Sequence, residues 1–379
     1  MTPRTILVVP FSNASESGQL DWVGEGISES IREALASAGL FVLEREERQE
    51  GLRRLSIRPN APFSKATALR MGQVLDADLL VYGEFTIGPE PNSRGYLKVA
   101  AHVIDLEKMA RVEEVLQGAR IEELARLQHE LAYRVLAAVE PELAGTRETF
   151  GERMPAIKLE ALEYFVQGLV AEQPEEQLRN WQAAIRADAR YSPARFLMGR
   201  LQYQRQNYRE AAEALERIPP SDAHYADSVF LKGLAYLAAG DAGRAANAFA
   251  KALQIAPLGE VHNNLGVARS RQNDLASAAE QFEKAREGDE ADAVYRFNLA
   301  YVWWRQGKAR ECLTELQGLL ERTPGDGEAR ELLTLCERET PAARMTEWIG
   351  RERTKQKFEE RAYRQLKALL EGARKKPED

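Results

Sequence analysis

The sequence contains few of the residues that build metal sites and disulfide frameworks. Of its 379 residues, only two are cysteine and four are histidine. None of the histidines lies at the spacing from another that two metal ligands on one helix or hairpin would need. The four are His102, His129, His224 and His262. We therefore expect no metal site and no cofactor.

The two cysteines, Cys312 and Cys336, each lie in an apolar helical pattern. This pattern favours two small buried side chains, because a free cysteine packs as a small apolar residue. A Cys312–Cys336 bridge and a reactive thiol are the alternatives. The cysteine content therefore does not indicate a redox compartment.

The chain also lacks the signatures of several function classes. It has no nucleophile elbow, phosphate-binding glycine loop or dinucleotide fingerprint, so we assign no catalytic residue and expect that it is not an enzyme. No apolar run reaches the roughly eighteen residues of a transmembrane helix. The net charge of −7 argues against general binding of nucleic acid. A content of 44% hydrophobic and 29% charged residues is typical of a folded globular protein.

In the first part of the chain, strand-like apolar runs alternate with amphipathic helical patterns. The last two strand segments are joined by a short polar turn, which predicts a hairpin. The order of the segments predicts an α/β domain with a mixed sheet over residues 1–145. Strands are predicted at 5–11, 40–44, 78–87, 96–106 and 111–121, and helices at 21–39, 64–77 and 122–139.

From about residue 159 onward every periodic segment is helical, and the pattern recurs. In GLAYLAAGDAGRAANAFAKALQIAP (233–257), Gly233 aligns with Gly266 and Phe249 with Phe282 of the next copy. The first small residues of four copies, at 199, 233, 266 and 300, are offset by 34, 33 and 34 residues. This period predicts a solenoid of helix pairs, which stack because one pair cannot bury its apolar face alone.

This repeat closely resembles the tetratricopeptide repeat. The resemblance implies an all-α superhelical solenoid over 159–338, with about five helix pairs and a capping helix, after a linker at 146–158. It also implies that the first helices of the pairs line a concave groove that binds a protein or peptide. The side chains expected in this groove are Phe196, Arg200, Tyr203, Phe230, Asn263, Arg271, Phe297, Tyr301, Trp304 and Arg305.

Aromatic and arginine side chains together are typical of interface hot spots. Packing between helices is the alternative for each of these groove residues. Some tetratricopeptide proteins hold a peptide's C-terminal carboxylate with polar donors. Phe230 occupies a position where such a clamp would need a donor. The sequence therefore favours an extended or helical peptide.

The first domain resembles the TolB amino-terminal-like domain that precedes tetratricopeptide repeats in bacterial proteins. Four segments carry the resemblance: ILVVPFSNAS (6–15), WVGEGISESI (22–31), DADLLVYGEFTIG (76–88) and VAAHVIDLEK (99–108). The resemblance implies an interaction or regulatory role in the bacterial envelope or in signalling. It brings no catalytic residues.

Residues 339–379 are predicted to form a basic C-terminal helix. Its apolar stripe would consist of Phe358, Ala362, Leu366 and Leu369, within a segment rich in Lys and Arg. A solenoid-capping role is expected, and binding to an acidic partner or an anionic membrane surface is the alternative.

These patterns predict a scaffold or adaptor that binds a peptide or protein segment in the solenoid groove. The alternative is a small-ligand sensor in the α/β domain, with the solenoid as its output to a signalling or envelope complex. The sequence begins almost at its first strand. We therefore expect a cytoplasmic protein, or a periplasmic one if an upstream export signal is missing from this sequence.

Overall fold

The computed structural model describes residues 4–15, 20–57, 64–153, 157–220, 222, 224–338, 346–359 and 363. Packing among these residues divides the chain into two compact units. The first unit runs to Met198 and includes Asp222. The second unit begins at Gly199 and includes the other described residues after it.

The first unit contains a six-stranded mixed sheet in the order β3-β1-β4-β5-β6, with β2 also paired to β4. β1 is parallel to β3 and β4, whereas β4, β5 and β6 pair antiparallel, so the predicted hairpin is confirmed. The strands are β1 (Thr5–Val8), β2 (Ser12–Asn13), β3 (Phe41–Val42), β4 (Leu79–Gly88), β5 (Tyr96–Asp105) and β6 (Ala110–Arg120).

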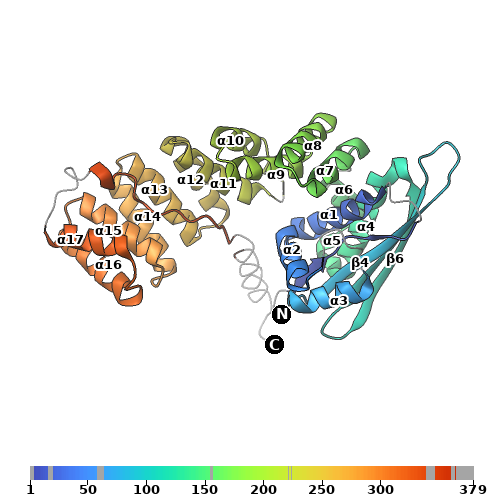
Figure 1. The fold of residues 1–379 in the computed structure, drawn as a ribbon, viewed down its shortest axis with the longest axis horizontal. Coiled ribbons are helices and arrows are strands. Elements are labelled where there is room, and N and C mark those ends of the chain that lie inside the picture. The colour runs from blue at the N-terminus through green and yellow to red at the C-terminus, as the bar shows by residue number, and fades with distance from the viewer. Residues whose placement is uncertain are drawn as a thin grey trace. The chain divides into compact units, whose positions relative to one another are not determined.

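Helices pack on both faces of this sheet because its central strands are apolar on both sides. Leu7 and Leu80 pack with Leu52 and Met71 of α2 and α3. On the other face α1 approaches so closely that a Cβ atom on Gly24 would lie 1.9 Å from the Phe11 carbonyl oxygen. Figure 1 shows α1 beside α4. The helices are α1 (Trp22–Ser37), α2 (Arg45–Arg54), α3 (Lys65–Val74), α4 (Leu124–Val139), α5 (Pro141–Ala144) and α6 (Arg147–Arg153).

The rest of the described chain is a run of helix pairs followed by a further helix, as the repeat predicts. The pair α7–α8 belongs to the first unit, because α7 packs against α1. The compact units therefore do not divide at the predicted linker, and part of that linker is helix α6. The helices are α7 (Leu159–Val170), α8 (Pro174–Ala187), α9 (Ser192–Gln204), α10 (Tyr208–Glu216), α11 (Tyr225–Ala238), α12 (Ala242–Ile255), α13 (Gly259–Arg271), α14 (Leu275–Gly288), α15 (Ala293–Arg305), α16 (Ala309–Arg322) and α17 (Gly327–Glu337).

The helices of a pair cross where a small residue faces a large ring. A Cβ atom on Gly233 would lie 2.6 Å from the Phe249 ring, and one on Gly266 would lie 2.6 Å from the Phe282 ring. Each ring follows its glycine by 16 residues, so one crossing geometry recurs with the repeat. The turn positions recur as well. Positive φ angles occur at Gln206, Gly240, Asn273 and Gly307.

Two expectations are corrected here. Cys312 and Cys336 form a disulfide between α16 and α17, so the favoured interpretation of two free buried thiols is wrong and the bridge alternative is found. Where two helices pack at small residues, two cysteine sulfur atoms can come within bonding distance. Sequence periodicity places both cysteines on buried helix faces but does not distinguish a disulfide from two free thiols. The helix expected after residue 350 is wrong over residues 351–359, which have no helix or strand. Ala362, Leu366 and Leu369 lie outside the described residues.

Within the described part of the chain, no helix has both the length and the apolar character needed to cross a membrane.

Candidate functional site

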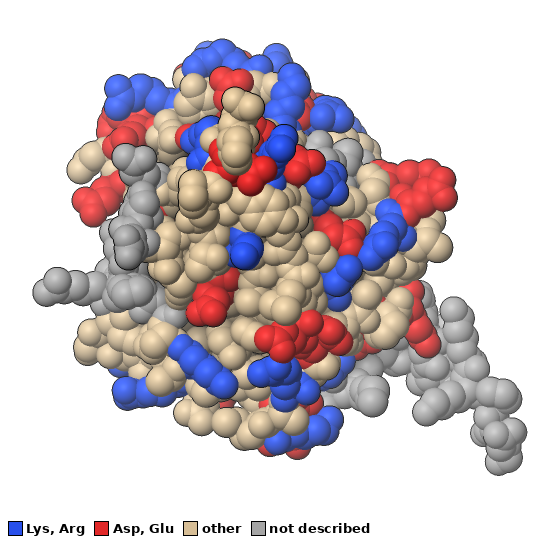
Figure 2. Space-filling view, turned by 90° about the vertical axis from the view of Figure 1, so that its right-hand side faces the viewer, with Lys and Arg blue, Asp and Glu red and all other residues tan. Residues whose placement is uncertain are grey.

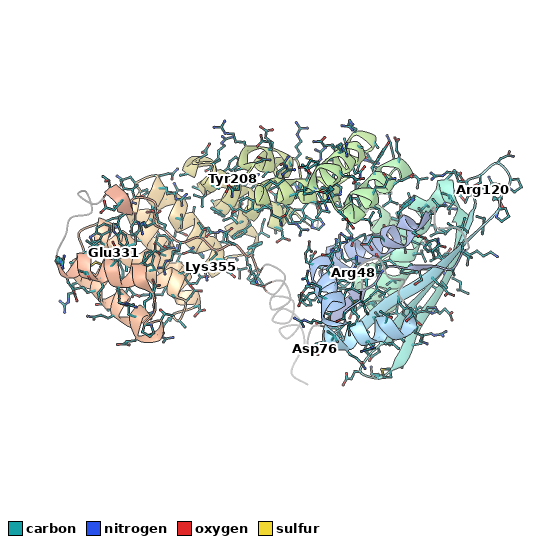
Figure 3. All side chains as sticks on the ribbon, viewed as in Figure 1. Arg48, Asp76, Arg120, Tyr208, Glu331 and Lys355 are labelled. Atoms are coloured by element: carbon teal, nitrogen blue, oxygen red, sulfur yellow. A yellow bond between two sulfur atoms is a disulfide. The ribbon has the colours of Figure 1, made fainter. Side chains whose placement is uncertain are left out.

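A short 3₁₀ turn, η4 (Thr346–Trp348), and the irregular residues after it form one segment, 346–359. This segment contacts α15 and α13 first and then α11 and α9. Lys355 marks its position in Figure 3. We call the surface beneath the segment the groove. It consists of Tyr203, Phe230, Asn263, Asn264, Ser270, Arg271, Asp292, Tyr295, Phe297, Asn298, Tyr301, Trp304, Arg305, Asp326 and Glu328.

Asparagine side chains hold the backbone of the segment. Asn298 accepts a hydrogen bond from the Arg353 N–H at 2.8 Å and donates to the Arg353 carbonyl at 2.7 Å. Asn264 makes the same pair of bonds to Lys355, both at 2.8 Å. The two asparagines are 34 residues apart, which is one repeat. Successive repeats therefore bind alternate residues of an extended backbone, as a neighbouring strand would.

A third buried asparagine joins these two. Asn263 donates to the Arg353 carbonyl at 3.0 Å and accepts from the Asn298 amide at 2.8 Å. All three asparagines are fully buried. Buried amides are stable only when they are hydrogen-bonded, so the segment satisfies polar groups that the helices leave open.

Glu352 is the acidic contact of the segment, and its side chain is 0% exposed. The Ser270 hydroxyl donates to one carboxylate oxygen. The guanidinium of Arg305 lies 3.4 Å from that oxygen, and the guanidinium of Arg271 lies 3.6 Å from the other. An unpaired buried carboxylate would be strongly destabilising, and these two cations compensate for its desolvation.

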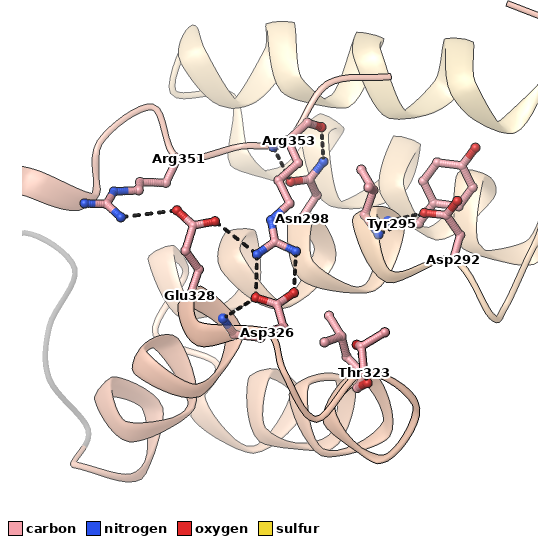
Figure 4. A network of polar contacts seen from close by, with 11 residues as sticks. Asp292, Tyr295, Asn298, Thr323, Asp326, Glu328, Arg351 and Arg353 are labelled. Atoms are coloured by element: carbon pink, nitrogen blue, oxygen red, sulfur yellow. Dashed lines mark hydrogen bonds and ion pairs between the residues drawn. The ribbon is translucent and has the colours of Figure 1, made fainter. Parts of the chain in front are cut away.

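Arg351, Arg353 and Lys355 carry the basic contacts, and Arg351 bonds Glu328 at 3.2 Å. Arg353 forms two parallel bonds to Asp326, at 2.7 and 2.9 Å, and a third to Glu328 at 3.0 Å (Figure 4). Its guanidinium lies 3.6 Å from the centre of the Phe297 ring. Hydrogen bonding from Arg353 lowers the pKa of the Asp326 carboxyl. Lys355 pairs with Asp292.

Aromatic residues anchor the two ends of the segment. Trp348 meets Trp304 edge-to-face at 5.8 Å, and its carbonyl accepts a hydrogen bond from the Tyr301 hydroxyl at 2.5 Å. Burial and then the Glu352 carboxylate raise the pKa of Tyr301. At the other end, Phe358 stacks on Phe230 with 4.9 Å between ring centres. The groove therefore has aromatic positions at both ends and charged positions between them.

Eight of the ten residues predicted for the groove contact the segment. They are Tyr203, Phe230, Asn263, Arg271, Phe297, Tyr301, Trp304 and Arg305. The prediction took these side chains as exposed, whereas Phe230, Asn263, Phe297, Tyr301 and Trp304 are buried. Helix packing and the segment cover them. Phe196 lies in the first unit and Arg200 is half-buried on α9, and partner binding by all ten stays a prediction.

The prediction missed the asparagines that bind both backbone groups and the carboxylates that bind the basic side chains. Asn264 and Asn298 precede the small crossing residues Gly266 and Ala300 by two positions. A polar residue repeated at this buried position is a signal that the sequence carries. Asp292, Asp326 and Glu328 give no comparable signal, because acidic residues are common where helices begin.

In the part of the chain that the structure describes, no three His, Cys, Asp or Glu side chains are grouped so that they could hold a metal ion. On the face drawn in Figure 2, basic and acidic side chains of the described residues are interspersed rather than separated by sign. Such a face gives no uniform basic surface for nucleic acid.

Comparison with known proteins bears on the helical part. The family model for the tetratricopeptide repeat matches residues 196–260 and 263–327, so the chain contains tetratricopeptide repeats. No curated protein matches the chain.

Solved structures similar to the chain include YrrB, described as a TPR protein with an unusual peptide-binding site. It is 17% identical, with a TM-score of 0.41, and the match covers 47% of this chain and 92% of YrrB. MamA of Desulfovibrio magneticus RS-1 is 18% identical, with a TM-score of 0.41, over 44% of this chain and 97% of that one. The LpoB C-terminal domain of Salmonella enterica is 12% identical, with a TM-score of 0.26, over 31% and 84%.

Proposed function

We propose that this chain is a scaffold without enzymatic activity, and that its groove binds an extended segment of a partner protein. The observation that supports this most directly is the pairing of Asn264 and Asn298 with both backbone groups of alternate residues. Backbone pairing does not depend on side-chain identity, so the same amides can hold another extended segment. Aromatic and charged groove positions would then select among such segments.

The first unit would dock a second partner or position the repeats. Its β-α-β order and mixed sheet agree with the TolB amino-terminal-like domain that its sequence resembles, and membership of that bacterial family is part of the proposal. A small-ligand sensor in this unit remains the alternative. An acidic partner or an anionic membrane surface for the basic residues after 359 also remains a proposal.

The Cys312–Cys336 disulfide supports an oxidising compartment, because structural disulfides rarely persist in a reducing cytosol. We therefore favour the exported alternative over the cytoplasmic one. Alkylation of the protein taken directly from cells should modify neither cysteine. Modification of both thiols would favour the cytoplasm.

The groove proposal is tested by selecting peptides from a displayed library of random extended sequences. The bait is the full chain carrying Trp348→Ala and Phe358→Ala, which weaken the hold of its own segment and leave the groove intact. We expect selected peptides to lose at least about tenfold in affinity when Asn264→Ala and Asn298→Ala are added, since each change removes two backbone hydrogen bonds.

Asn247→Ala is the matched control, because Asn247 is exposed on α12. It should leave peptide binding unchanged, and circular dichroism should report a folded chain for every variant. A library that yields only peptides indifferent to Asn264 and Asn298 would refute the proposed function.

A further inference from the structure

Segment 346–359 meets the groove as a ligand would. After the 3₁₀ turn η4, its residues 351–359 have no helix or strand, and side chains of the solenoid bond both its backbone and its charged groups. The partners are distant in sequence: Asn298 is 55 residues from Arg353, and Asn264 is 91 residues from Lys355. The segment therefore occupies the positions that a partner's extended segment would need.

The contacts along the segment define an order of side-chain types. An aromatic residue (Trp348) comes first, and an acidic residue (Glu352) follows four positions later. Basic residues follow at the next position and two positions after that (Arg353 and Lys355), and a second aromatic residue (Phe358) lies ten positions after the first. Each type faces a complementary site.

The acidic position is the most selective of these sites. The Glu352 side chain is completely enclosed, with Ser270, Arg271 and Arg305 around it. A basic side chain there would meet two guanidinium groups without solvent to screen the repulsion. A neutral side chain would leave the Ser270 hydroxyl and the two cations without their carboxylate, and the loss of a charged hydrogen-bond partner in a buried site is costly.

The next position of the segment, which Arg353 occupies, excludes an acidic side chain. Arg353 lies between the carboxylates of Asp326 and Glu328 (Figure 4). Its guanidinium also lies over the Phe297 ring. An acidic residue in its place would face two like charges. The groove therefore discriminates by sign at two adjacent positions, acidic and then basic.

We propose that segment 346–359 is a ligand bound in cis, and that the partner that displaces it carries the same order of aromatic, acidic, basic, basic and aromatic side chains. This rests on the proposed function of the groove. Because the segment belongs to the same chain, its effective concentration at the groove is on the order of millimolar. A partner segment therefore binds weakly until the chain's own segment leaves.

The test uses the full chain with a protease site introduced within residues 339–345. The probe is a fluorescently labelled synthetic peptide with the sequence of residues 346–359. Fluorescence polarisation is measured before cleavage and again after cleavage and dialysis. We expect affinity for the probe to rise at least about tenfold after cleavage, as the tethered competitor becomes free to leave. Equal affinity before and after would overturn occupancy in cis.

Peptide variants test the order of side chains without any risk to folding of the chain. Glu352→Gln in the probe should weaken binding to the cleaved chain at least about tenfold, because it removes the charge enclosed by Arg271 and Arg305. Glu359→Gln is the matched control, because Glu359 is exposed and should tolerate the change. Equal loss for both variants, or for neither, would refute selection at the acidic position.

A sharper test exchanges the two charges of the Arg305–Glu352 contact between the chain and the probe. Arg305→Glu in the chain should abolish binding of the unaltered probe, and Glu352→Lys in the probe should restore part of it. Absence of any rescue in a folded chain would count against the assigned contact.

The two proposals fail in different ways. Library peptides that depend on Asn264 and Asn298 but show no acidic–basic order, together with no effect of cleavage, would overturn the cis-ligand proposal alone. If no selected peptide depends on Asn264 and Asn298, the proposed function itself is wrong, and the cis-ligand proposal that rests on it is wrong as well.

Discussion

The first helices of two repeat pairs, α7 and α15, pack against different kinds of structure. In the first unit, α7 packs on the long helix α1: Val166 is 0% exposed, and a Cβ atom on Gly26 would lie 3.3 Å from its side chain. In the second unit, α15 covers an irregular segment through Asn298, Tyr301 and Arg305. The first contact is largely apolar and helix to helix, whereas the second is largely polar and helix to extended chain.

Charged groups beside the α1–α7 contact are paired between helices. Glu25 of α1 pairs with Arg45, at 2.9 Å, and with Arg48, which Figure 3 labels on α2. Arg45 also donates to the Leu169 carbonyl of α7 at 2.6 Å. The comparison teaches that similar Arg–Glu chemistry serves a contact between regular elements in the first unit and, in our proposal, an exchangeable contact with an extended segment in the second.

The largest expected effect concerns how tightly α7 packs on α1. Val166→Asp should lower the free energy of unfolding by about 3 kcal/mol or more, because it buries an unpaired charge between α7 and α1. Urea denaturation followed by circular dichroism measures this. Val170→Asp is the control on the same helix, because Val170 is 48% exposed, and it should stay within about 0.5 kcal/mol of the unaltered chain. Similar values for both variants would show that the contact is not tightly packed.

A second prediction concerns the support of the exchangeable contact. The disulfide fixes α17 to α16, and the start of α17 provides Asp326 and Glu328 for Arg353. Replacing Cys312 and Cys336 together by Ala should cost about 3 kcal/mol of stability, as expected for a loop of 24 residues.

Limited proteolysis should then cut segment 346–359 faster, while peptides from α1 and α7 keep their protection. Mass spectrometry of the fragments distinguishes the two sites. An unchanged cleavage rate of the segment would mean that α17 does not control how firmly it is held.

The last prediction concerns α1 itself, and its effect vanishes at low pH. Burial, and then the Asp222 carboxylate, raise the pKa of Glu33 from 4.5 to about 8. The folded chain therefore holds a proton that the unfolded chain releases above about pH 4.5, so the contribution of Glu33 to stability declines as pH rises from about 4.5 to 8. Glu33→Gln should stabilise the chain at pH 9, where the folded chain must hold a buried charge, and have almost no effect at pH 4.

Thermal melts at the two pH values check this. Glu160→Gln, at an exposed position of α7, is the control and should show no such pH dependence. A Glu33→Gln variant whose melting temperature changes equally at both pH values would exclude the raised pKa as the cause.

The sequence predicts much of the fold because its signals are local. The cap of α3 is one such signal: the Ser64 hydroxyl accepts from the Thr67 N–H at 3.1 Å. The left-handed turn between the helices of a pair falls at Gly240 and, one repeat earlier, at Gln206. Turns of this kind are specified within a few residues, so pattern alone locates them to within one position.

The sequence by itself determined the helical period, the recurring glycine and aromatic positions, and eight of the fifteen residues that line the groove. The period and the recurring positions follow from residue spacing, whereas the groove residues follow from the resemblance to the tetratricopeptide repeat. Only the tertiary structure decided that Cys312 bonds Cys336, and that residues 346–359 bind across the repeats instead of forming a helix. An extended segment has no partners nearby in sequence: its backbone bonds reach asparagines 55 and 91 residues away, and no local period encodes such distances.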